Sequence, residues 1–215
     1  MANIIVEKSN IRGIFSAPAI GNYGGDYSFA GVFLARAAID SSVVCDNLNP
    51  HSEQNGTVVL DIIRSFGAKQ RRSGNSVNII ANKLHGCHCD ISEFTQISPM
   101  IALLATFATG KTRISGFSGC QELLDVIVYN LRALGVRCAL GTNDLWIWPQ
   151  RSPEHAVLDA KEHPYMAMAL ILISTYTKGQ TLIRNIDGLL KRYPDFLDTF
   201  SRLGGRFELT DRPII

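Results

Sequence analysis

The sequence predicts an α/β fold made of three repeated βαβαβ(β) units around buried helices. One pattern, a turn followed by a short β-branched strand, begins at residues 41, 110 and 179, so that successive copies start 69 residues apart. A second pattern, the apolar end of a helix followed by glycine, keeps nearly the same step and ends at Gly67, Gly135 and Gly204. Two patterns that stay in phase over three copies indicate one supersecondary unit repeated three times.

Each unit is predicted to begin with an apolar, alanine-rich helix, at residues 29–38, 100–108 and 166–176. These segments are apolar nearly all round, which is typical of buried helices. A turn and the short strand follow each of them, and then comes a second, amphipathic helix with charged residues on its outer side. The glycine after this second helix is suited to a left-handed cap.

One or two strands are predicted to close each unit, at residues 77–81, then 137–140 with 145–148, and finally 206–209. We expect a single domain over residues 1–215, with units at about residues 20–87, 88–155 and 156–215. Residues 1–7 form a short apolar strand and lack the organisation of a signal peptide.

Composition excludes several function classes. The net charge of +2 favours neither nucleic acid nor an anionic membrane, and the basic cluster of Lys69, Arg71 and Arg72 has no interleaved aromatic residues. No apolar run reaches the ~18 residues of a membrane span. Five scattered cysteines are typical of reduced thiols. We therefore expect a cytoplasmic protein that binds neither nucleic acid nor membrane.

Several segments also resemble a known family, in order and over about residues 20–209. Residues 25–30 read Gly-Asp-Tyr-Ser-Phe-Ala and run into an alanine-rich helix, and residues 191–196 read Lys-Arg-Tyr-Pro-Asp-Phe. Residues 90–99 and the Met-Ala-Met-Ala of residues 166–169 lie between them at matching distances. In this order, the segments resemble the C-terminal half of enolpyruvylshikimate-phosphate synthase, an enolpyruvyl transferase.

The resemblance implies a fold, a reaction and partners. The family has two globular halves, each made of three such units, with the active site in the cleft between them. It transfers the enolpyruvyl group of phosphoenolpyruvate to the 5-hydroxyl of shikimate 3-phosphate, in aromatic amino acid biosynthesis, and releases phosphate. The expected ligands are therefore phosphorylated small molecules or other anions, and the expected partner is an N-terminal half domain or another protein. No cofactor or metal is expected.

The resemblance also implies the site residues. Lys191 matches a lysine that contacts phosphoenolpyruvate, and here we expect it to open a helix. Glu122 matches a catalytic glutamate, and Gln96 stands where the family has a proton-transferring aspartate. Ser28 and His163 are expected at substrate-binding helix starts, where free backbone N–H groups attract anions. For His163 the preferred interpretation is a residue that caps or precedes the helix, with Pro164 in the first turn.

Several positions depart from the family pattern. Gln121, Asp125 and Tyr165 stand where the family places phosphate-binding cations, and glutamine at position 96 cannot accept a proton usefully near neutral pH. The favoured function is a domain of the enolpyruvyl transferase family that is inactive as an isolated half. The alternative is a non-catalytic relative that binds a protein partner or a small anion.

One other group of residues is a candidate for different chemistry. His85, Cys87 and Cys89 alternate, so that on a strand they would share a face and could bind zinc or copper. The sequence offers no second ligand pair at a typical separation, and cysteine on the inner face of a strand packs as a small apolar residue. The packing interpretation is therefore preferred.

Overall fold

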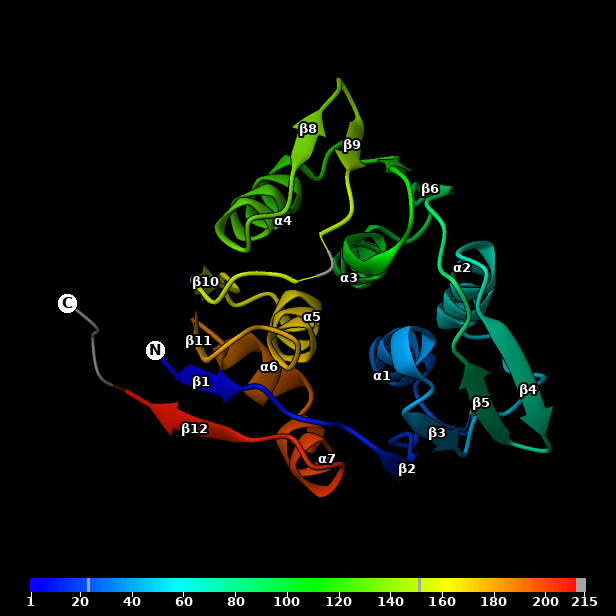
Figure 1. Cartoon of the computed structure of the whole chain (residues 1–215). Helices are drawn as coiled ribbons and strands as arrows, with labels where there is room; N and C mark the ends of the chain where they lie inside the picture. The colour runs from blue at the N-terminus through cyan, green and yellow to red at the C-terminus, as the bar shows by residue number, and fades with distance from the viewer. Residues whose placement is uncertain (23, 151, 212–215) are drawn as a thin grey trace.

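Three four-stranded sheets surround a set of packed helices in the described part of the chain, which is residues 1–22, 24–150 and 152–211 of a computed structural model (Figure 1). The helices pack against the inner faces of the sheets, and α4 contacts both β8 of the second sheet and β10 of the third. The α/β class and the three repeated units predicted from the sequence are confirmed.

The first sheet has the strand order β2-β3-β5-β4, in which β2 and β3 are parallel and β5 is antiparallel to both of its neighbours. The elements of this unit follow one another directly along the chain. They are β2 (Gly13–Ser16), α1 (Tyr27–Asp40), β3 (Val43–Asp46), a 3-10 turn η1 (Asn55–Thr57), α2 (Val58–Ser65), β4 (Lys69–Ser73) and β5 (Ser76–Ile80).

The second sheet repeats this topology with the order β6-β7-β9-β8. Its unit is again continuous in sequence. The elements are β6 (His88–Asp90), a 3-10 turn η2 (Thr95–Ile97), α3 (Ser98–Phe107), β7 (Thr112–Ser115), α4 (Gln121–Ala133), β8 (Cys138–Leu140) and β9 (Asp144–Ile147).

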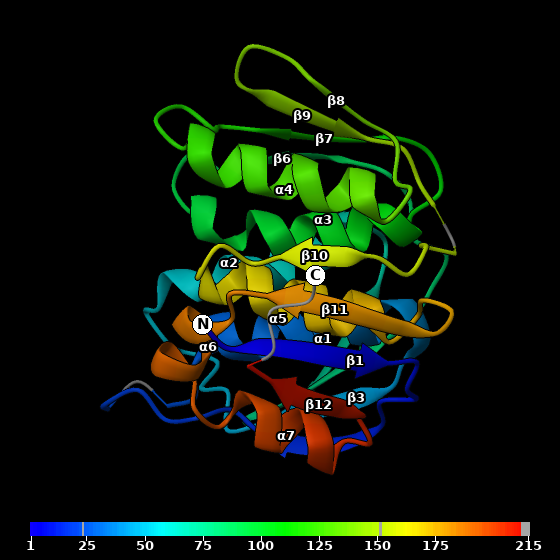
Figure 2. The same ribbon diagram turned by 90° about the vertical axis from the view of Figure 1, so that its left-hand side faces the viewer.

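The third sheet has the equivalent order β10-β11-β1-β12, but one strand comes from the other end of the chain (Figure 2). β1 (Asn3–Glu7) lies antiparallel between β11 and β12, in the place that β5 and β9 take in the other sheets. The remaining elements are β10 (Val157–Asp159), α5 (Pro164–Ser174), β11 (Gln180–Arg184), α6 (Asp187–Arg192), α7 (Phe196–Arg202) and β12 (Phe207–Thr210). The sequence repeat marks neither this placement of β1 nor β2, which precedes residue 20.

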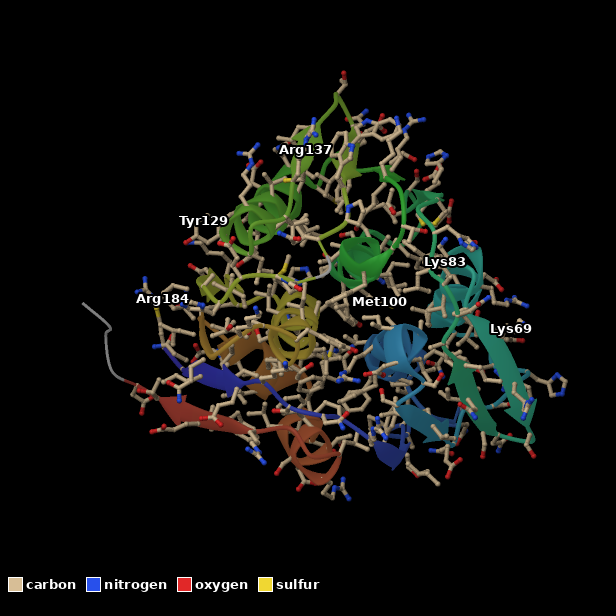
Figure 3. The ribbon with its side chains drawn as sticks, in the orientation of Figure 1. Lys69, Lys83, Met100, Tyr129, Arg137 and Arg184 are labelled. Carbon is tan, nitrogen blue, oxygen red and sulfur yellow. The ribbon has the colours of Figure 1, made fainter. Side chains whose placement is uncertain are left out.

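The core lies where α1, α3 and α5 pack against one another. α5 is buried from Met166 to Ser174, and α3 is buried from Ser98 to Thr106, as their apolar sequences predict. Figure 3 shows Met100 among these helices, whereas Lys69 and Arg137 lie at the periphery. None of the helices in the described residues is long and apolar enough to span a membrane.

The recurring glycine ends the second helix of each unit in a left-handed conformation. Gly67, Gly135 and Gly204 have φ angles of 96°, 74° and 97°. Their amides donate to carbonyl groups of the preceding helical turn, at 2.8–3.0 Å. A side chain is strained at such φ values, which explains why glycine returns at this step of the repeat.

One fully buried charge ties the first unit to the third. Arg36 of α1 is 1% exposed and donates to Asp40 at 2.8 Å and to Ser42 at 2.7 Å. Its guanidinium lies 4.7 Å from the ring centroid of Tyr176, and Tyr176 donates its own hydroxyl to Asp40 at 2.9 Å. A buried cation is tolerated because each of these partners offsets part of its lost hydration.

Candidate functional site

Two open cavities adjoin where α1, α3, α4 and α5 begin, and Gln96 lines both of them. The first, which we call the Glu122 cavity, has a volume of about 490 Å³. The second, the Arg192 cavity, has a volume of about 470 Å³. Cavities of this size accommodate small-molecule ligands.

The Glu122 cavity is bounded by the start of α4, by the turn between β10 and α5, and by the turn η2 before α3. Its polar lining includes Glu122 in the first turn of α4 and His163 at the N-cap of α5. The full set is Thr95, Gln96, Gly119, Cys120, Glu122, Leu123, Val126, Lys161, Glu162, His163 and Pro164.

The Arg192 cavity lies against the start of α1 and the end of α6. Tyr165 of α5 and Arg192 of α6 face it from the third unit, and Ser28 faces it from the first. The full set is Ile20, Asp26, Ser28, Glu53, Gln54, Gly56, Gln96, Tyr165 and Arg192.

Two of the helix starts at these cavities are already capped by side chains. The Asp26 carboxylate accepts from the backbone N–H groups of Ser28 and Phe29, at 2.7 and 3.1 Å. The His163 ring accepts from the N–H of Met166 at 3.4 Å through Nδ1. The expectation of free anion-binding N–H groups is therefore wrong for α1 and α5, while the interpretation of His163 as a cap is confirmed.

The His163 ring has to be neutral to accept this hydrogen bond, because a protonated ring has no acceptor. Burial lowers the pKa of His163 below its ordinary value. The ring also lies 6.2 Å from that of Tyr165. The third unit therefore presents a neutral imidazole to the Glu122 cavity at pH 7.

The turn that carries Lys161 and Glu162 into the Glu122 cavity is strained. Both residues have left-handed backbone, with φ angles of 49° and 60°. The amide of His163 donates to the carbonyl of Ala160 at 2.9 Å and closes the turn. Left-handed backbone costs about 1–2 kcal/mol for each residue other than glycine, so neighbouring contacts have to hold this turn in place.

A pair of tyrosines separates the Arg192 cavity from the core. The hydroxyls of Tyr165 and Tyr193 are 2.7 Å apart, and the Arg192 guanidinium lies 5.7 Å from the ring centroid of Tyr193. Burial, together with the hydrogen bond to Tyr165, raises the pKa of Tyr193. The Tyr193 hydroxyl therefore stays protonated near neutral pH.

The structure brings together most of the residues singled out from the sequence. Gln96, Glu122 and His163 line one cavity, and Ser28 lines its neighbour with Gln96. Lys191 is exposed and is not part of either lining; it lies in the last turn of α6, so the expectation that it opens a helix is wrong.

Gln121 lies outside the cavities, whereas three residues that the sequence did not predict line them. Gln121 donates to Asp125 at 2.7 Å on the exposed side of α4. The sequence reasoning missed Arg192, Lys161 and Glu162 as lining residues. Arg192 could have been predicted from the basic pair that it forms with Lys191. Nothing in the Lys161-Glu162 sequence predicts a left-handed turn.

The charges of the two linings are unfavourable for a phosphate held by this chain alone. Four carboxylates, of Asp26, Glu53, Glu122 and Glu162, line the cavities, against the two cations of Lys161 and Arg192. The chemistry that this arrangement suits is hydrogen bonding to hydroxyl groups, with one or two contacts to anionic oxygens.

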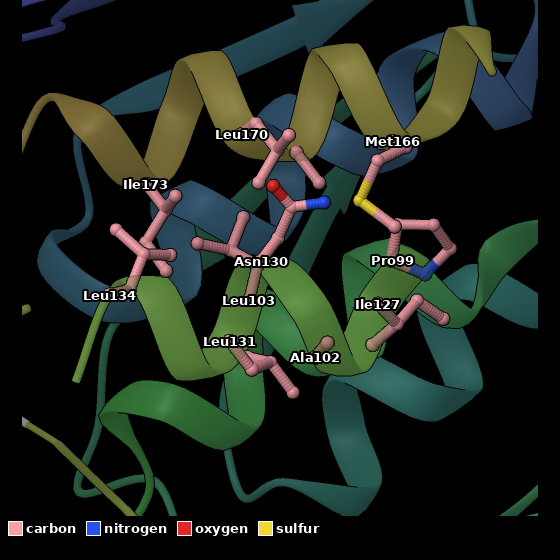
Figure 4. A pocket seen from close by; sticks show the side chains of 11 residues that line it. Pro99, Ala102, Leu103, Ile127, Asn130, Leu131, Leu134, Met166, Leu170 and Ile173 are labelled. Carbon is pink, nitrogen blue, oxygen red and sulfur yellow. The ribbon is translucent and has the colours of Figure 1, made fainter. Parts of the chain in front are cut away.

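A third cavity lies inside the protein, between α3, α4 and α5, and has a volume of about 20 Å³ (Figure 4). Its lining is apolar except for Asn130, and the labelled Leu170 and Ile173 lie on α5. Asn130 is engaged elsewhere: its amide donates to the carbonyls of Val126 and Asp159 at 2.8 Å and accepts from the Asp159 N–H at 2.9 Å. This cavity is a packing gap, and Asn130 beside it joins α4 to β10.

The histidine and cysteine cluster does not assemble into a metal site. Among the described residues, no group of three or more histidine, cysteine, aspartate or glutamate side chains is arranged to bind a metal. The Cys87 and Cys89 sulfurs lie 3.5 Å apart, and His85 lies instead against Gly67 of the first unit. Cys89 is buried on β6 and packs as a small apolar residue.

Comparisons with known proteins agree with this geometry. The family model of EPSP synthase (3-phosphoshikimate 1-carboxyvinyltransferase) matches residues 19–200. The 3-phosphoshikimate 1-carboxyvinyltransferase of Pyrococcus furiosus is 28% identical over 182 residues, which are 83% of this chain and 45% of that protein. The protein of the same name from Methanopyrus kandleri is 28% identical over 184 residues, 83% of this chain and 43% of that protein.

Solved structures share the fold at lower identity. EPSP synthase from Acinetobacter baumannii superposes with a TM-score of 0.75 at 20% identity, over 87% of this chain and 47% of that one. The enolpyruvyl transferase NikO from Streptomyces tendae gives a TM-score of 0.70 at 20% identity, over 88% and 45%. The chain thus spans less than half the length of these relatives. Since the family model matches most of its residues, the chain belongs to the EPSP synthase family and corresponds to one half of that fold.

Proposed function

We propose that this chain is the C-terminal-type half of an enolpyruvyl transferase, and that its two cavities form one side of a cleft for phosphoenolpyruvate and shikimate 3-phosphate. The observation that carries the proposal is that Gln96, Glu122, His163 and Ser28, taken from three different units, meet at adjoining cavities. The relatives' names support the reaction and its place in the shikimate pathway.

In this function, the chain's residues divide the chemistry as follows. Transfer joins the acceptor hydroxyl oxygen to the enolpyruvyl carbon while a proton adds to the methylene group; phosphate and a methyl proton then leave. Glu122 is the carboxylate placed to exchange a proton, and Gln96 and Ser28 orient hydroxyl groups. Lys191 and Arg192 provide positive charge at the end of α6.

We further propose that the isolated chain does not complete the reaction. A second half has to supply the other side of the cleft, and the carboxylates outnumber the cations in the linings seen here. A phosphate group buried beside unpaired carboxylates is poorly compensated. The missing cations are therefore expected on the complementary half.

The same charge balance supports the alternative function. A relative that has lost catalysis needs no phosphate-binding cations, and it would use this face to bind a protein partner or a small anion. The positions that favour this alternative are Gln96, Gln121, Asp125 and Tyr165, none of which carries a positive charge.

The deciding experiment measures phosphate release from phosphoenolpyruvate and shikimate 3-phosphate by the chain alone and after mixing with an N-terminal half of a family member. Calorimetry with shikimate 3-phosphate runs in parallel. The proposal expects no turnover by the chain alone, measurable binding, and turnover on mixing that is lost in Glu122→Gln. Absence of both binding and reconstituted turnover would leave the alternative function.

A further inference from the structure

We infer that Lys161 and Glu162 are ligand-binding residues of the Glu122 cavity, retained in a strained turn because their side chains contact a phosphorylated, hydroxyl-bearing ligand there. The inference rests on the proposed function, which makes this cavity part of a substrate cleft. It adds two residues to which neither the family pattern nor the sequence repeat draws attention.

The turn is held in its unfavourable conformation by many contacts. Asp159 accepts from the Lys161 N–H at 2.8 Å and from the Asn185 side chain at 2.8 Å. The Glu162 N–H donates to the carbonyl of Asn185 at 2.9 Å. Gly188 packs so closely that an added Cβ would come within 1.6 Å of the Glu162 carbonyl oxygen. Such over-determination is what allows a strained backbone to persist, and strained residues gather at functional sites.

The fold itself does not call for lysine and glutamate at these positions. Two successive left-handed residues closed by a hydrogen bond are the geometry of a type I′ turn, for which Asn-Gly is favoured. Lys161 makes an ion pair with Asp159 at 3.3 Å, but its side chain is 62% exposed, and such pairs contribute little. Within the described residues, the Glu162 side chain is exposed and has no hydrogen bond or ion pair.

The side chains do have a use in the cavity. Lys161 is the one lysine or arginine among the described lining residues, so it is the contact available to an anionic oxygen. Glu162 joins Glu122 on the lining, and two carboxylates accept hydrogen bonds from hydroxyl groups. The ligand class that satisfies both is a phosphate ester, or comparable anion, of a polyhydroxylated small molecule.

The test separates strain from ligand binding with two sets of variants and two probes. Lys161→Asn with Glu162→Gly relieves the left-handed backbone, and we expect the Tm to rise by about 2–4 °C while shikimate 3-phosphate binds at least about tenfold more weakly. Lys161→Gln and Glu162→Gln keep the backbone strained and remove one charge each. We expect unchanged Tm values and the same direction of loss for shikimate 3-phosphate, read by NMR titration.

Inorganic phosphate distinguishes the two roles. Lys161→Gln should weaken phosphate binding, whereas Glu162→Gln should leave it equal or slightly tighter because a repulsive carboxylate is gone. Ser41→Gly is the matched control, since Ser41 is left-handed with φ of 57° at the end of α1 and lies outside both cavities. Its affinity for both probes should equal that of the wild type.

The outcomes fall into distinct groups. If the wild type binds shikimate 3-phosphate and all three Lys161 and Glu162 variants bind it equally well, the inference is overturned and the proposed function stands. If the relief variant loses stability, the turn is not strained and the inference fails on that ground. If the wild type binds neither probe, the proposed function fails and the inference falls with it.

Discussion

The third sheet has the same strand topology as the first two sheets, but it takes one strand from a distant part of the chain. In the first two, the third strand of the sheet order, β5 or β9, comes from the same continuous stretch of chain. In the third, that strand is β1, which pairs Ile4 with Ile183 and with Leu209. β11 and β12 each offer a free edge, and any strand that buries every second side chain can pair with them, whatever its position in the sequence. The third unit is therefore complete in space, although its strands are not continuous in sequence.

The difference predicts an unequal dependence on the N-terminal strand. Closing the third sheet brings together residues almost 180 positions apart, and ordering such a loop has an entropic cost that has to be offset by burial. Ile4 and Val6 supply that burial, since both are 0% exposed. The third unit also carries His163 and the strained Lys161–Glu162 turn, so its closure and the site are linked.

The largest effect is therefore expected at the centre of β1. Ile4→Ala should lower the free energy of unfolding by about 2–5 kcal/mol, because it leaves a cavity under the buried face of the third sheet, which α5 covers. Ile14→Ala is the matched control: it makes the same change on β2 at a side chain that is 68% exposed, and should alter stability by less than about 0.5 kcal/mol. Urea denaturation measures both, and equal losses would show that β1 is no more important than an edge strand.

The next effect tests how the second unit is joined to the third. Asn130→Ala removes the amide that pairs with both backbone groups of Asp159, so it leaves buried polar groups unsatisfied. We expect a loss of about 1–3 kcal/mol. Gln121→Ala removes an exposed amide from the same helix and should cost less than about 0.5 kcal/mol. A comparable loss in both variants would mean that the link from Asn130 to β10 contributes no more than an exposed hydrogen bond does.

Two capped helices offer a smaller, pH-dependent contrast between the first and third units. α1 is capped by the Asp26 carboxylate and α5 by the neutral His163 ring. Because burial lowers the pKa of His163 below 6.5, the unfolded chain takes up this proton first as pH falls. The stability that the cap contributes is thus fully present above pH 6.5 and is lost as pH falls from there through the folded-state pKa.

The measurement is urea denaturation at pH 7.5 and pH 5.5. His163→Asn keeps a capping oxygen and removes the titration, so its stability should change less between the two pH values than that of the wild type, by up to about 1 kcal/mol. His163→Leu should lose about 1 kcal/mol already at pH 7.5. Identical pH dependence in wild type and His163→Asn would show that other groups control the acid response.

The sequence could predict the features that depend on interactions between residues close together in the chain. The buried helices are recognisable because α3 and α5 are apolar all round, and the caps at Gly67, Gly135 and Gly204 because one local conformation demands glycine. Gln96, Glu122 and His163 were found through the family pattern, and they share a cavity.

The rest depends on features that a linear pattern does not encode. Periodicity identifies β1 as a strand but not its partners, which lie at the far end of the chain. The Lys161–Glu162 turn lacks the Asn-Gly signal and is imposed by Asp159, Asn185 and Gly188. At the end of α6, a shift of one residue decides which side chain faces a cavity, because each helical residue is turned by about 100° from the one before it.

That last point gives the smallest and sharpest comparison, between two neighbouring cations. Lys191 matches the family's lysine but lies outside both linings, whereas Arg192 lines the Arg192 cavity beside Tyr165. We expect Arg192→Gln to weaken the binding of shikimate 3-phosphate by about tenfold, as the loss of a charge-assisted hydrogen bond does. Lys191→Gln removes the same charge one residue away and should change the affinity by less than about twofold, through screened long-range attraction alone. Titrations at low and high salt separate the two effects, because only the contribution of Lys191 should vanish at high salt. If Lys191→Gln causes the larger loss, α6 is placed differently when a ligand is bound, and the family's lysine keeps its role in this chain.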